Sequence, residues 1–218
     1  DIWVQEYSQG NKKAAVKKIG KTKNNGTIIT FQPDPTIFKE GIAFDHKTIV
    51  DHVRQQAYLV KKLRVTVIDA REVAENMDPT SVFWFADLGI EAPSTTYYFE
   101  GGIQSMVRHY NQLQKPIHDS VFYCEKDQDG VGVEIALQYV DDISARIVPF
   151  ANNIYNPEHG THVTGFKTAL TRILNTYGKK NNLIKDADGP FSGDDVLEGL
   201  TVVISVKLAE IQFEGQTK

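Results

Sequence analysis

The sequence predicts an α+β fold, in which strands and helices mix without the regular alternation of a parallel sheet. Runs of β-branched and aromatic residues, bounded by Gly, Asn and Pro, indicate strands near both ends of the chain. Residues 45–59 and 161–177 place apolar side chains at helical spacing. The turn at residues 127–130 joins two strand patterns directly, which is typical of antiparallel pairing.

The first 33 residues predict consecutive strands. Strand patterns at residues 2–7 and 16–19 flank a polar, Gly-containing turn. Asn25-Gly26 predicts a tight hairpin, because this pair tolerates positive φ. A β-branched and aromatic strand is expected at residues 27–31, before prolines end the sheet.

A helix is expected next, over residues 45–59, with Asp45 as its N-cap. Strands are expected at residues 63–68 and 95–99. Between them, residues 71–96 change character, since loop-forming residues surround a short aromatic run. We therefore predict an insertion there.

We place a domain boundary at Gly101-Gly102, where the first half of the chain ends. A helix should follow, and its apolar face consists of Ile103, Met106, Val107 and Tyr110. The strands at residues 121–123 and 131–139 alternate apolar and polar side chains, so we expect a sheet with one buried face.

The clearest helix is predicted over residues 161–177. Its inward face is expected to contain Val163, Phe166, Leu170, Ile173, Leu174 and Tyr177. Ser192 predicts the N-cap of a short helical turn, and a final strand is expected at residues 200–208.

The charge distribution argues against a stand-alone DNA-binding protein. The chain holds 24 basic and 28 acidic residues, a net charge of −4. Residues 1–100 carry 13 of each sign, and residues 101–218 carry 11 basic and 15 acidic residues. Because such proteins are normally basic, any DNA contact must come from a local patch.

The single cysteine, Cys124, cannot form an internal disulfide, so we expect a reducing compartment and a small buried apolar residue at this position. No segment is long and apolar enough to span a bilayer, and no signal peptide opens the chain. These features predict a cytoplasmic protein with no membrane partner. The first residue, Asp1, and the abrupt end on Lys218 predict an internal fragment of a longer protein.

Several strings follow one another in the order that one protein family carries them. They are GTIITFQPDPTIF (26–38), FEGGI (99–103), ANNI (151–154), GTHVTGF (160–166), ALTR (169–172), EGLTVVISVK (198–207) and QFEGQTK (212–218). Together they resemble the ATPase subunit of bacterial type IIA topoisomerases, that is, the B subunit of DNA gyrase and its topoisomerase IV counterpart. The resemblance covers nearly the whole chain apart from residues 71–96.

The resemblance implies two modules. Residues 1–100 would be the C-terminal part of a Bergerat (GHKL) ATPase sandwich, and residues 101–218 a transducer domain similar to the second domain of ribosomal protein S5. The family's catalytic Glu, Mg²⁺-holding Asn and adenine-binding Asp would lie in an N-terminal half that this chain lacks. The fragment alone is therefore expected to be inactive, with ATP and Mg²⁺ bound by the full-length protein.

Three positions depart from the family pattern. His159, Leu197 and Ile211 stand where the family usually has Gly, Arg and Pro. They bear on local turns and ion pairs more than on function.

The terminal loop carries the expected nucleotide contacts. A Lys on a Gly-containing loop just past a buried strand can be aimed at a phosphate, and Gln216 lies on the same side of the segment as Lys218. In the family this loop touches the γ-phosphate, which implies a catalytic and ATP-binding role for Lys218 and an ATP-binding role for Gln216. An isolated Gln-Thr-Lys tripeptide would instead be an ordinary surface loop.

Thr27 is a further ATP-binding candidate, since the family places this Thr at the floor of the adenine pocket. The alternative is a β-forming Thr at the start of a strand. Neither His162 nor the paired aspartates lie at metal spacing, so no metal ligand is expected within the chain.

Basic residues on the long helix are candidates for DNA contact. In the family, the position of Lys167 faces the cavity through which a DNA segment passes, and Arg172 and Lys179 are further candidates. The alternative is a solvated helix face.

The resemblance implies a subunit that couples ATP hydrolysis to DNA strand passage. Its partners would be DNA, a second copy bound through the missing N-terminal region, and the DNA-cleaving A subunit in an A2B2 tetramer. Gyrase with negative supercoiling is the first expectation. The alternatives are the B subunit of topoisomerase IV, a decatenase, or a non-catalytic paralogue that only dimerises or binds DNA. A mismatch-repair or chaperone ATPase of the same superfamily fits the ending less well.

Overall fold

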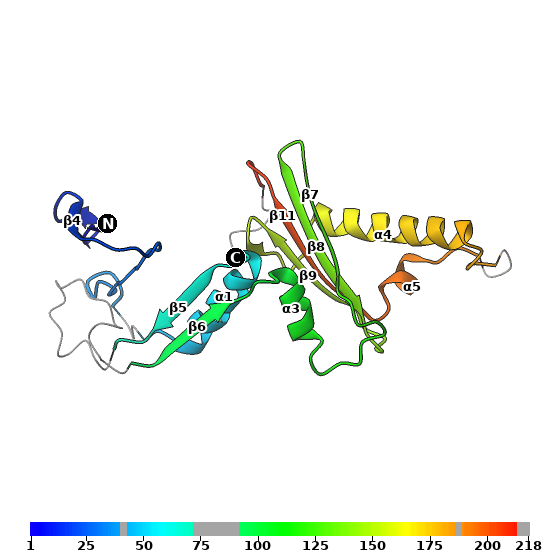
Figure 1. The fold of residues 1–218 in the computed structure, drawn as a ribbon, viewed down its shortest axis with the longest axis horizontal. Coiled ribbons are helices and arrows are strands. Elements are labelled where there is room, and N and C mark those ends of the chain that lie inside the picture. Colours follow the sequence, from blue (N-terminus) through cyan, green and yellow to red (C-terminus); the bar gives the residue numbers. More distant parts are fainter. Residues whose placement is uncertain (40–42, 72–91, 186–188, 213–218) are drawn as a thin grey trace. The chain divides into compact units, whose positions relative to one another are not determined.

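The structure is a computed structural model that describes residues 1–39, 43–71, 92–185 and 189–212 (Figure 1). Its contacts divide the chain into two units. The N-terminal unit comprises residues 1–50 and 67–95, and the sheet unit comprises residues 51–66 and 96–218. Each unit is described by itself.

The N-terminal unit begins with two small antiparallel pairs. The first joins β1 (Ile2–Val4) to β4 (Lys17–Gly20), and the second joins β2 (Tyr7–Ser8) to β3 (Asn11–Lys12). Gln9 and Gly10, with φ of 50° and 77°, make the tight turn between β2 and β3. The predicted strands at both ends of this segment are therefore confirmed in shortened form.

The strand expected at residues 27–31 is wrong, because these residues have no regular structure. A strand is stabilised by the backbone of a neighbour, and none of the pairings among the described residues includes this segment. Ile28, Ile29 and Phe31 are 56%, 81% and 68% exposed, so β propensity alone does not order the segment here.

The predicted helix and its cap are confirmed by α1 (His46–Leu59). The Asp45 carboxylate accepts hydrogen bonds from the Lys47 amide at 3.0 Å and the Thr48 hydroxyl at 2.6 Å, which satisfies an otherwise unpaired N–H of the first turn. A two-stranded sheet follows, made of β5 (Arg64–Ile68) and β6 (Ser94–Tyr98). Most of the predicted insertion, residues 72–91, lies outside the described residues.

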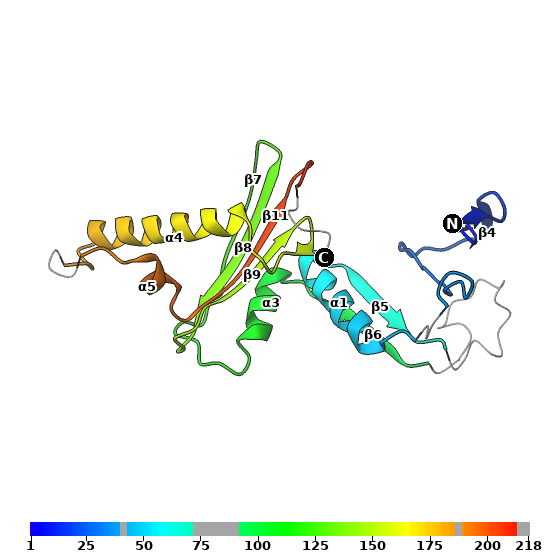
Figure 2. The ribbon, with the colours of Figure 1, turned by 180° about the vertical axis from the view of Figure 1, so that it is seen from behind.

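The sheet unit is built on five strands in the order β10-β9-β11-β8-β7 (Figures 1 and 2). Their bounds are β7 Phe122–Gln128, β8 Val131–Tyr139, β9 Arg146–Ala151, β10 Ile154–Tyr155 and β11 Leu200–Lys207. The last strand, β11, lies in the middle and runs antiparallel to β8 and parallel to β9. The sheet is therefore mixed.

Both faces of this sheet are covered, so the expectation of one buried face is wrong. On one face, α3 (Ile103–Tyr110) and the end of α1 contribute to a core around Ile103, Phe150 and Val203. On the other face, α4 (Thr161–Lys180) packs Val163, Phe166 and Leu170 against a second cluster. Every residue of β11 from Leu200 to Val206 is buried, as expected for a strand that is covered on both sides.

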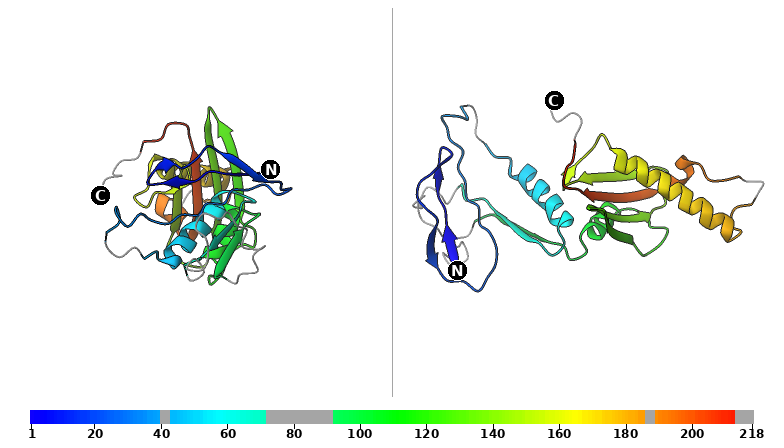
Figure 3. Two further views of the ribbon diagram at one scale, coloured as in Figure 1. Left: turned by 90° about the vertical axis from the view of Figure 1, so that its left-hand side faces the viewer. Right: turned by 90° about the horizontal axis from the view of Figure 1, so that it is seen from above.

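The predicted long helix is confirmed, but two of the six residues of its predicted inward face are exposed. Val163 is buried, whereas Ile173 and Tyr177 are 59% and 60% exposed. A helix of 20 residues is about 30 Å long, and Figure 3 shows α4 running past the end of the sheet. Residues beyond that edge keep helical spacing but have no sheet beneath them.

Of two further predictions for the sheet unit, the Ser192 cap is confirmed and the burial of Cys124 is wrong. The short helix α5 (Gly193–Leu197) has the predicted Ser192 cap, and Asp195 completes a capping box. Cys124, expected to be buried, is exposed, and it lies on β7, one of the two edge strands of the sheet. Within the described residues, no helix has the length and hydropathy needed to cross a membrane.

Candidate functional site at the end of the central strand

The strand β11 leads directly into the terminal segment, and Asn152 holds the chain where the strand ends. The Asn152 side chain donates to the Leu208 carbonyl and accepts from the Leu208 amide, both at 2.9 Å. The Asn152 amide also donates to the Val206 carbonyl at 2.8 Å. Three hydrogen bonds therefore fix the backbone as it leaves the sheet.

A polar groove of about 530 Å³ lies at this end of the sheet. It is lined by the β7–β8 hairpin, by the end of β11 and by Asn152 and Asn153. Ser205 and Asn153 belong to the lining, and their Oγ and Oδ1 atoms are buried with no hydrogen-bond partner among the described residues. The terminal segment therefore begins beside a polar surface, since Leu208 and Ala209 belong to the same lining.

An ion cluster borders the groove. Glu125 of β7 and Glu134 of β8 lie directly opposite each other in the antiparallel ladder. Like charges in such a pair repel. Lys61 lies between them, with its Nζ 3.1 Å from a carboxylate oxygen of each, and it also donates a hydrogen bond to the Tyr123 hydroxyl.

The ionisation of the cluster follows from these contacts. Burial alone would lower the pKa of Lys61, but hydrogen bonds to Tyr123, Glu125 and Glu134 outweigh it and raise the pKa above its ordinary value. Burial, followed by the hydrogen bond with Glu125, raises the pKa of the Tyr123 phenol. The hydrogen bond from Tyr123, followed by that from Lys61, lowers the pKa of Glu125. At neutral pH the cluster thus contains one ammonium and an ionised Glu125.

Gly102 leaves room for this lysine. It has a φ of 53°, and a Cβ built on it would come within 2.6 Å of Lys61 Cγ. The Lys61 side chain therefore crosses the start of α3 on its way to the hairpin. Glycine at position 102 of the FEGGI string therefore serves two purposes: it allows the positive φ, and it leaves space for the Lys61 side chain.

Replacing Lys61 with methionine should destabilise the sheet unit by about 1 kcal/mol at neutral pH, since the facing carboxylates lose their counter-ion. A lowered carboxyl pKa stabilises the fold above the unfolded pKa, and this stabilisation is lost as pH falls through the folded value. A raised lysine pKa stabilises the fold below the unfolded pKa, and this stabilisation is lost as pH rises through the folded value. The difference between wild type and variant should therefore be largest between about pH 5 and pH 10.

Urea unfolding across that pH range measures the difference. Lys126→Met is the matched control. Lys126 is an exposed lysine on β7, the strand that carries Glu125, and it takes no part in the described cluster. Equal stability losses in both variants at every pH would show that the cluster has no specific role.

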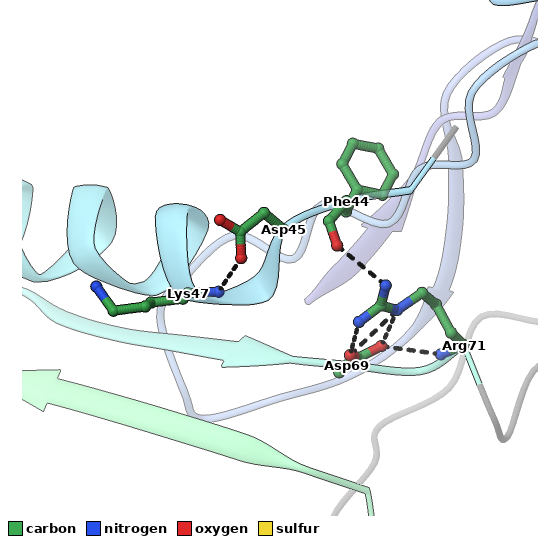
Figure 4. A network of polar contacts seen from close by, with 5 residues as sticks. All are labelled: Phe44, Asp45, Lys47, Asp69 and Arg71. Atoms are coloured by element: carbon green, nitrogen blue, oxygen red, sulfur yellow. Dashed lines mark hydrogen bonds and ion pairs between the residues drawn. The ribbon is translucent and has the colours of Figure 1, made fainter. Parts of the chain in front are cut away.

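A second ion pair fixes the N-terminal unit near α1 (Figure 4). The Arg71 guanidinium donates two hydrogen bonds to the Asp69 carboxylate, from Nε to Oδ1 at 2.8 Å and from Nη2 to Oδ2 at 2.5 Å. It also donates to the Phe44 carbonyl at 3.0 Å. Arg71 hydrogen bonds lower the pKa of Asp69 to about 2. The pair ties the end of β5 to the segment that precedes α1.

The predicted site residues are placed unevenly. Thr27 is exposed in the irregular segment of the N-terminal unit. On α4, Lys167 is half-buried, while Arg172 and Lys179 are exposed. At about 100° per residue, Arg172 and Lys179 share one stripe and Lys167 lies on another. Gln216 and Lys218 fall outside the described residues.

Two of the predicted nucleotide contacts, Gln216 and Lys218, lie outside the described residues, so only Thr27 has a described environment. No group of three or more His, Cys, Asp or Glu side chains in the described part of the chain is arranged to hold a metal ion. Thr27 lies on an exposed segment without regular structure.

A comparison with protein families decides the membership of the chain. A family model described as DNA gyrase B matches residues 102–218, just over half of the sequence. The chain belongs to the DNA gyrase B family. This match covers the strands β7 to β11 and the helices α3, α4 and α5.

Relatives and solved structures agree with this membership. The DNA gyrase B protein of Bacillus mycoides is 41% identical over 217 residues, covering 100% of this chain and 49% of that protein. The DNA gyrase B protein of Halalkalibacterium halodurans is 42% identical, covering 100% of this chain and 31% of that protein. The chain thus spans about half the length, or less, of these curated relatives.

The crystal structure of the 43K ATPase domain of Thermus thermophilus gyrase B, in complex with an aminocoumarin, matches with a TM-score of 0.78 and 30% identity over 98% of this chain and 53% of that one. The topoisomerase IV ATP-binding domain of Francisella tularensis matches with a TM-score of 0.64 and 24% identity over 99% of this chain and 53% of that one, which shows a shared fold. The predicted fold class, that of gyrase-type ATPase domains, is confirmed.

Sequence reasoning missed Asn152 and the Lys61 cluster. The sequence predicted a turn at residues 127–130, but only the observed register places Glu125 opposite Glu134, where the facing carboxylates are stabilised by a nearby cation. That cation comes from Lys61, 64 residues before Glu125, and no sequence spacing links the two. Asn152 belongs to the ANNI string, but its contact with Leu208 spans 56 residues.

Proposed function

We propose that this chain is part of the ATP-hydrolysing subunit of DNA gyrase, which couples ATP binding and hydrolysis to DNA strand passage and negative supercoiling. The match of the gyrase B family model to residues 102–218 is the observation that carries this proposal. Within it, residues 1–100 act as the C-terminal part of the ATPase domain and residues 101–218 act as the transducer. DNA, a second copy and the A subunit are its partners in the cytoplasm.

The surface of the N-terminal unit supports a larger ATPase domain around it. Large apolar side chains are exposed there, including Trp3, Tyr7, Ile29, Phe31 and Ile37, each at 60% or more. Exposed apolar surface of this kind marks a contact with other protein groups. The solved gyrase B ATPase domain is about twice as long as the part that this chain covers.

The terminal loop is the proposed link between nucleotide and transducer. Lys218 binds the γ-phosphate, Gln216 donates a second hydrogen bond, and Thr27 contributes to the adenine pocket. Lys218 lies ten residues beyond Leu208 in the sequence. Ten fully extended residues span about 35 Å, which is the greatest reach of the loop from the end of the sheet. A contact made with ATP and lost with ADP gives the differential affinity that shifts one domain arrangement toward another.

The basic residues of α4 are the proposed DNA contacts. Arg172 and Lys179 are exposed on one stripe of the helix, and Lys167 is half-buried on another. Weak, backbone-directed attraction suits a segment of DNA that must pass and leave. The net charge of −4 confines any such contact to a local patch.

The decisive experiment is Lys218→Ala in the full-length subunit assembled with its A subunit. Steady-state ATP hydrolysis should fall about 100-fold, because a positioned donor to the reacting phosphate is lost. Lys115→Ala is the control, since Lys115 pairs with Asp141 on the surface and should leave hydrolysis unchanged. Equal hydrolysis by wild type and Lys218→Ala would refute the role of the loop. Decatenation without negative supercoiling by the wild-type complex would favour topoisomerase IV.

A further inference from the structure

The ladder between β9 and β11 is extended beyond its last backbone pair by a side chain. The two strands pair in parallel up to Ala151 and Val206. Beyond this pair, the Asn152 backbone N–H still donates to the Val206 carbonyl at 2.8 Å, and the residue then turns away with a φ of 47°. Its side-chain amide takes over, donating to and accepting from Leu208 at 2.9 Å. The amide thus serves as one more rung of the sheet.

The chemistry of this position is specific to asparagine. A primary amide carries both a donor and an acceptor, so it can satisfy the carbonyl and the N–H of Leu208 together. Asparagine also tolerates left-handed backbone better than other residues with a side chain. Aspartate would keep the acceptor and lose the donor, and glycine would keep the backbone and lose both.

The turn that carries Asn152 is itself held from a second element. The Gln56 side chain of α1 donates to the Asn153 carbonyl at 3.1 Å. The Asn152 amide donates to Val206 at 2.8 Å. Because the turn is fixed on two sides, the Asn152 side chain reaches Leu208 from a preset position, with little entropy left to lose.

We propose that Asn152 is a positioning residue for the terminal loop: it sets the direction in which the chain leaves β11, and so presents Lys218 to the γ-phosphate. This inference rests on the proposed function of the loop. A residue that orients a reacting group from a distance affects the rate through geometry, and small misplacements of such groups reduce the rate strongly.

A double-mutant cycle in the full-length subunit with its A subunit tests the inference. Asn152→Gly should lower kcat for ATP hydrolysis about tenfold while KM for ATP changes less than about twofold. In a Lys218→Ala background the same substitution should have no further effect, because Asn152 acts through that lysine. Asn152→Asp, which keeps one of the two hydrogen bonds, should lie between wild type and Asn152→Gly.

The control is Asn182→Gly, because Asn182 has a similar left-handed backbone, with a φ of 56°, and is exposed after α4. It should leave kcat unchanged. Should Asn152→Gly fail to fold, Asn152→Asp carries the cycle. An equal loss of kcat in both backgrounds, or no loss in either, would overturn the positioning role. A wild-type rate for Lys218→Ala alone would overturn the proposed function of the loop, and the inference with it.

Discussion

Replacing Gly199 with alanine is expected to destabilise the sheet unit by about 3–4 kcal/mol, an exceptional loss for adding one methyl group. Gly199 enters β11 with a φ of 68°, where a Cβ costs about 1–2 kcal/mol. The added Cβ would also lie 2.4 Å from the Val140 carbonyl oxygen and 2.9 Å from that of Asp142. Hydrogen bonds hold this backbone in place. The Val140 N–H donates to the Gly199 carbonyl, and the Asp142 N–H donates to the Val140 carbonyl, both at 2.9 Å.

Urea or thermal unfolding measures this loss, with Gly193→Ala as the matched control. Gly193 opens α5 only six residues earlier, has no left-handed backbone and offers open space around a new Cβ. The control should be neutral or slightly stabilising, since alanine restricts the unfolded chain. A Gly199→Ala protein as stable as the control would mean that the backbone around Gly199, Val140 and Asp142 can shift to accept a Cβ at little cost in stability.

Replacing Asn111 with alanine is expected to cost about 3 kcal/mol of stability. Asn111, Gln138 and Thr201 are 5%, 4% and 4% exposed. The Asn111 amide donates to Gln138 at 3.0 Å and accepts from the Thr201 hydroxyl at 2.7 Å. The substitution strands a buried acceptor on Gln138 and a buried donor on Thr201, and each such group costs about 1–3 kcal/mol.

A cycle with Thr201→Val separates this network from simple loss of volume. Thr201→Val removes the hydroxyl that Asn111 would otherwise leave stranded. The double variant should therefore be less destabilised than the sum of the single variants by about 1 kcal/mol. Strict additivity, measured by denaturant unfolding, would show that the hydrogen bonds to Asn111 contribute nothing beyond packing.

Short-range sequence patterns, such as helical spacing and N-cap residues, predicted most of the helices correctly. Residues 45–59 carried both a helical period and an Asp at the N-cap, and α1 begins at the next residue. Ser192 predicted the N-cap of the short helix α5, and the structure adds a capping box with Asp195. The family strings predicted the gyrase-type fold, which no period or turn could have specified alone.

The errors share a physical cause, which is that burial depends on neighbours distant in sequence. Ile173 and Tyr177 have the right spacing for an inward face, but the sheet does not extend beneath them. Cys124 has a commonly buried side chain on an edge strand. The segment at residues 27–31 has strong β propensity and no partner among the described strands.

The candidate site was predicted only through the family strings and the terminal loop. Asn152 and Lys61 act through contacts that span 56 and 64 residues, and neither spacing has a local pattern. Such contacts exist only once the sheet has assembled, so no reading of a short window could find them.

The position of β11 has a consequence for synthesis on the ribosome. The strand that completes the middle of the sheet is the last of the five to be made. Until residue 207 has emerged, β8 and β9 each present an open backbone edge, and such edges recruit other nascent chains. A premature stop before Leu200 would leave this half permanently unclosed, so truncated translation products should be cleared as aggregates or by proteases rather than persist as partial subunits.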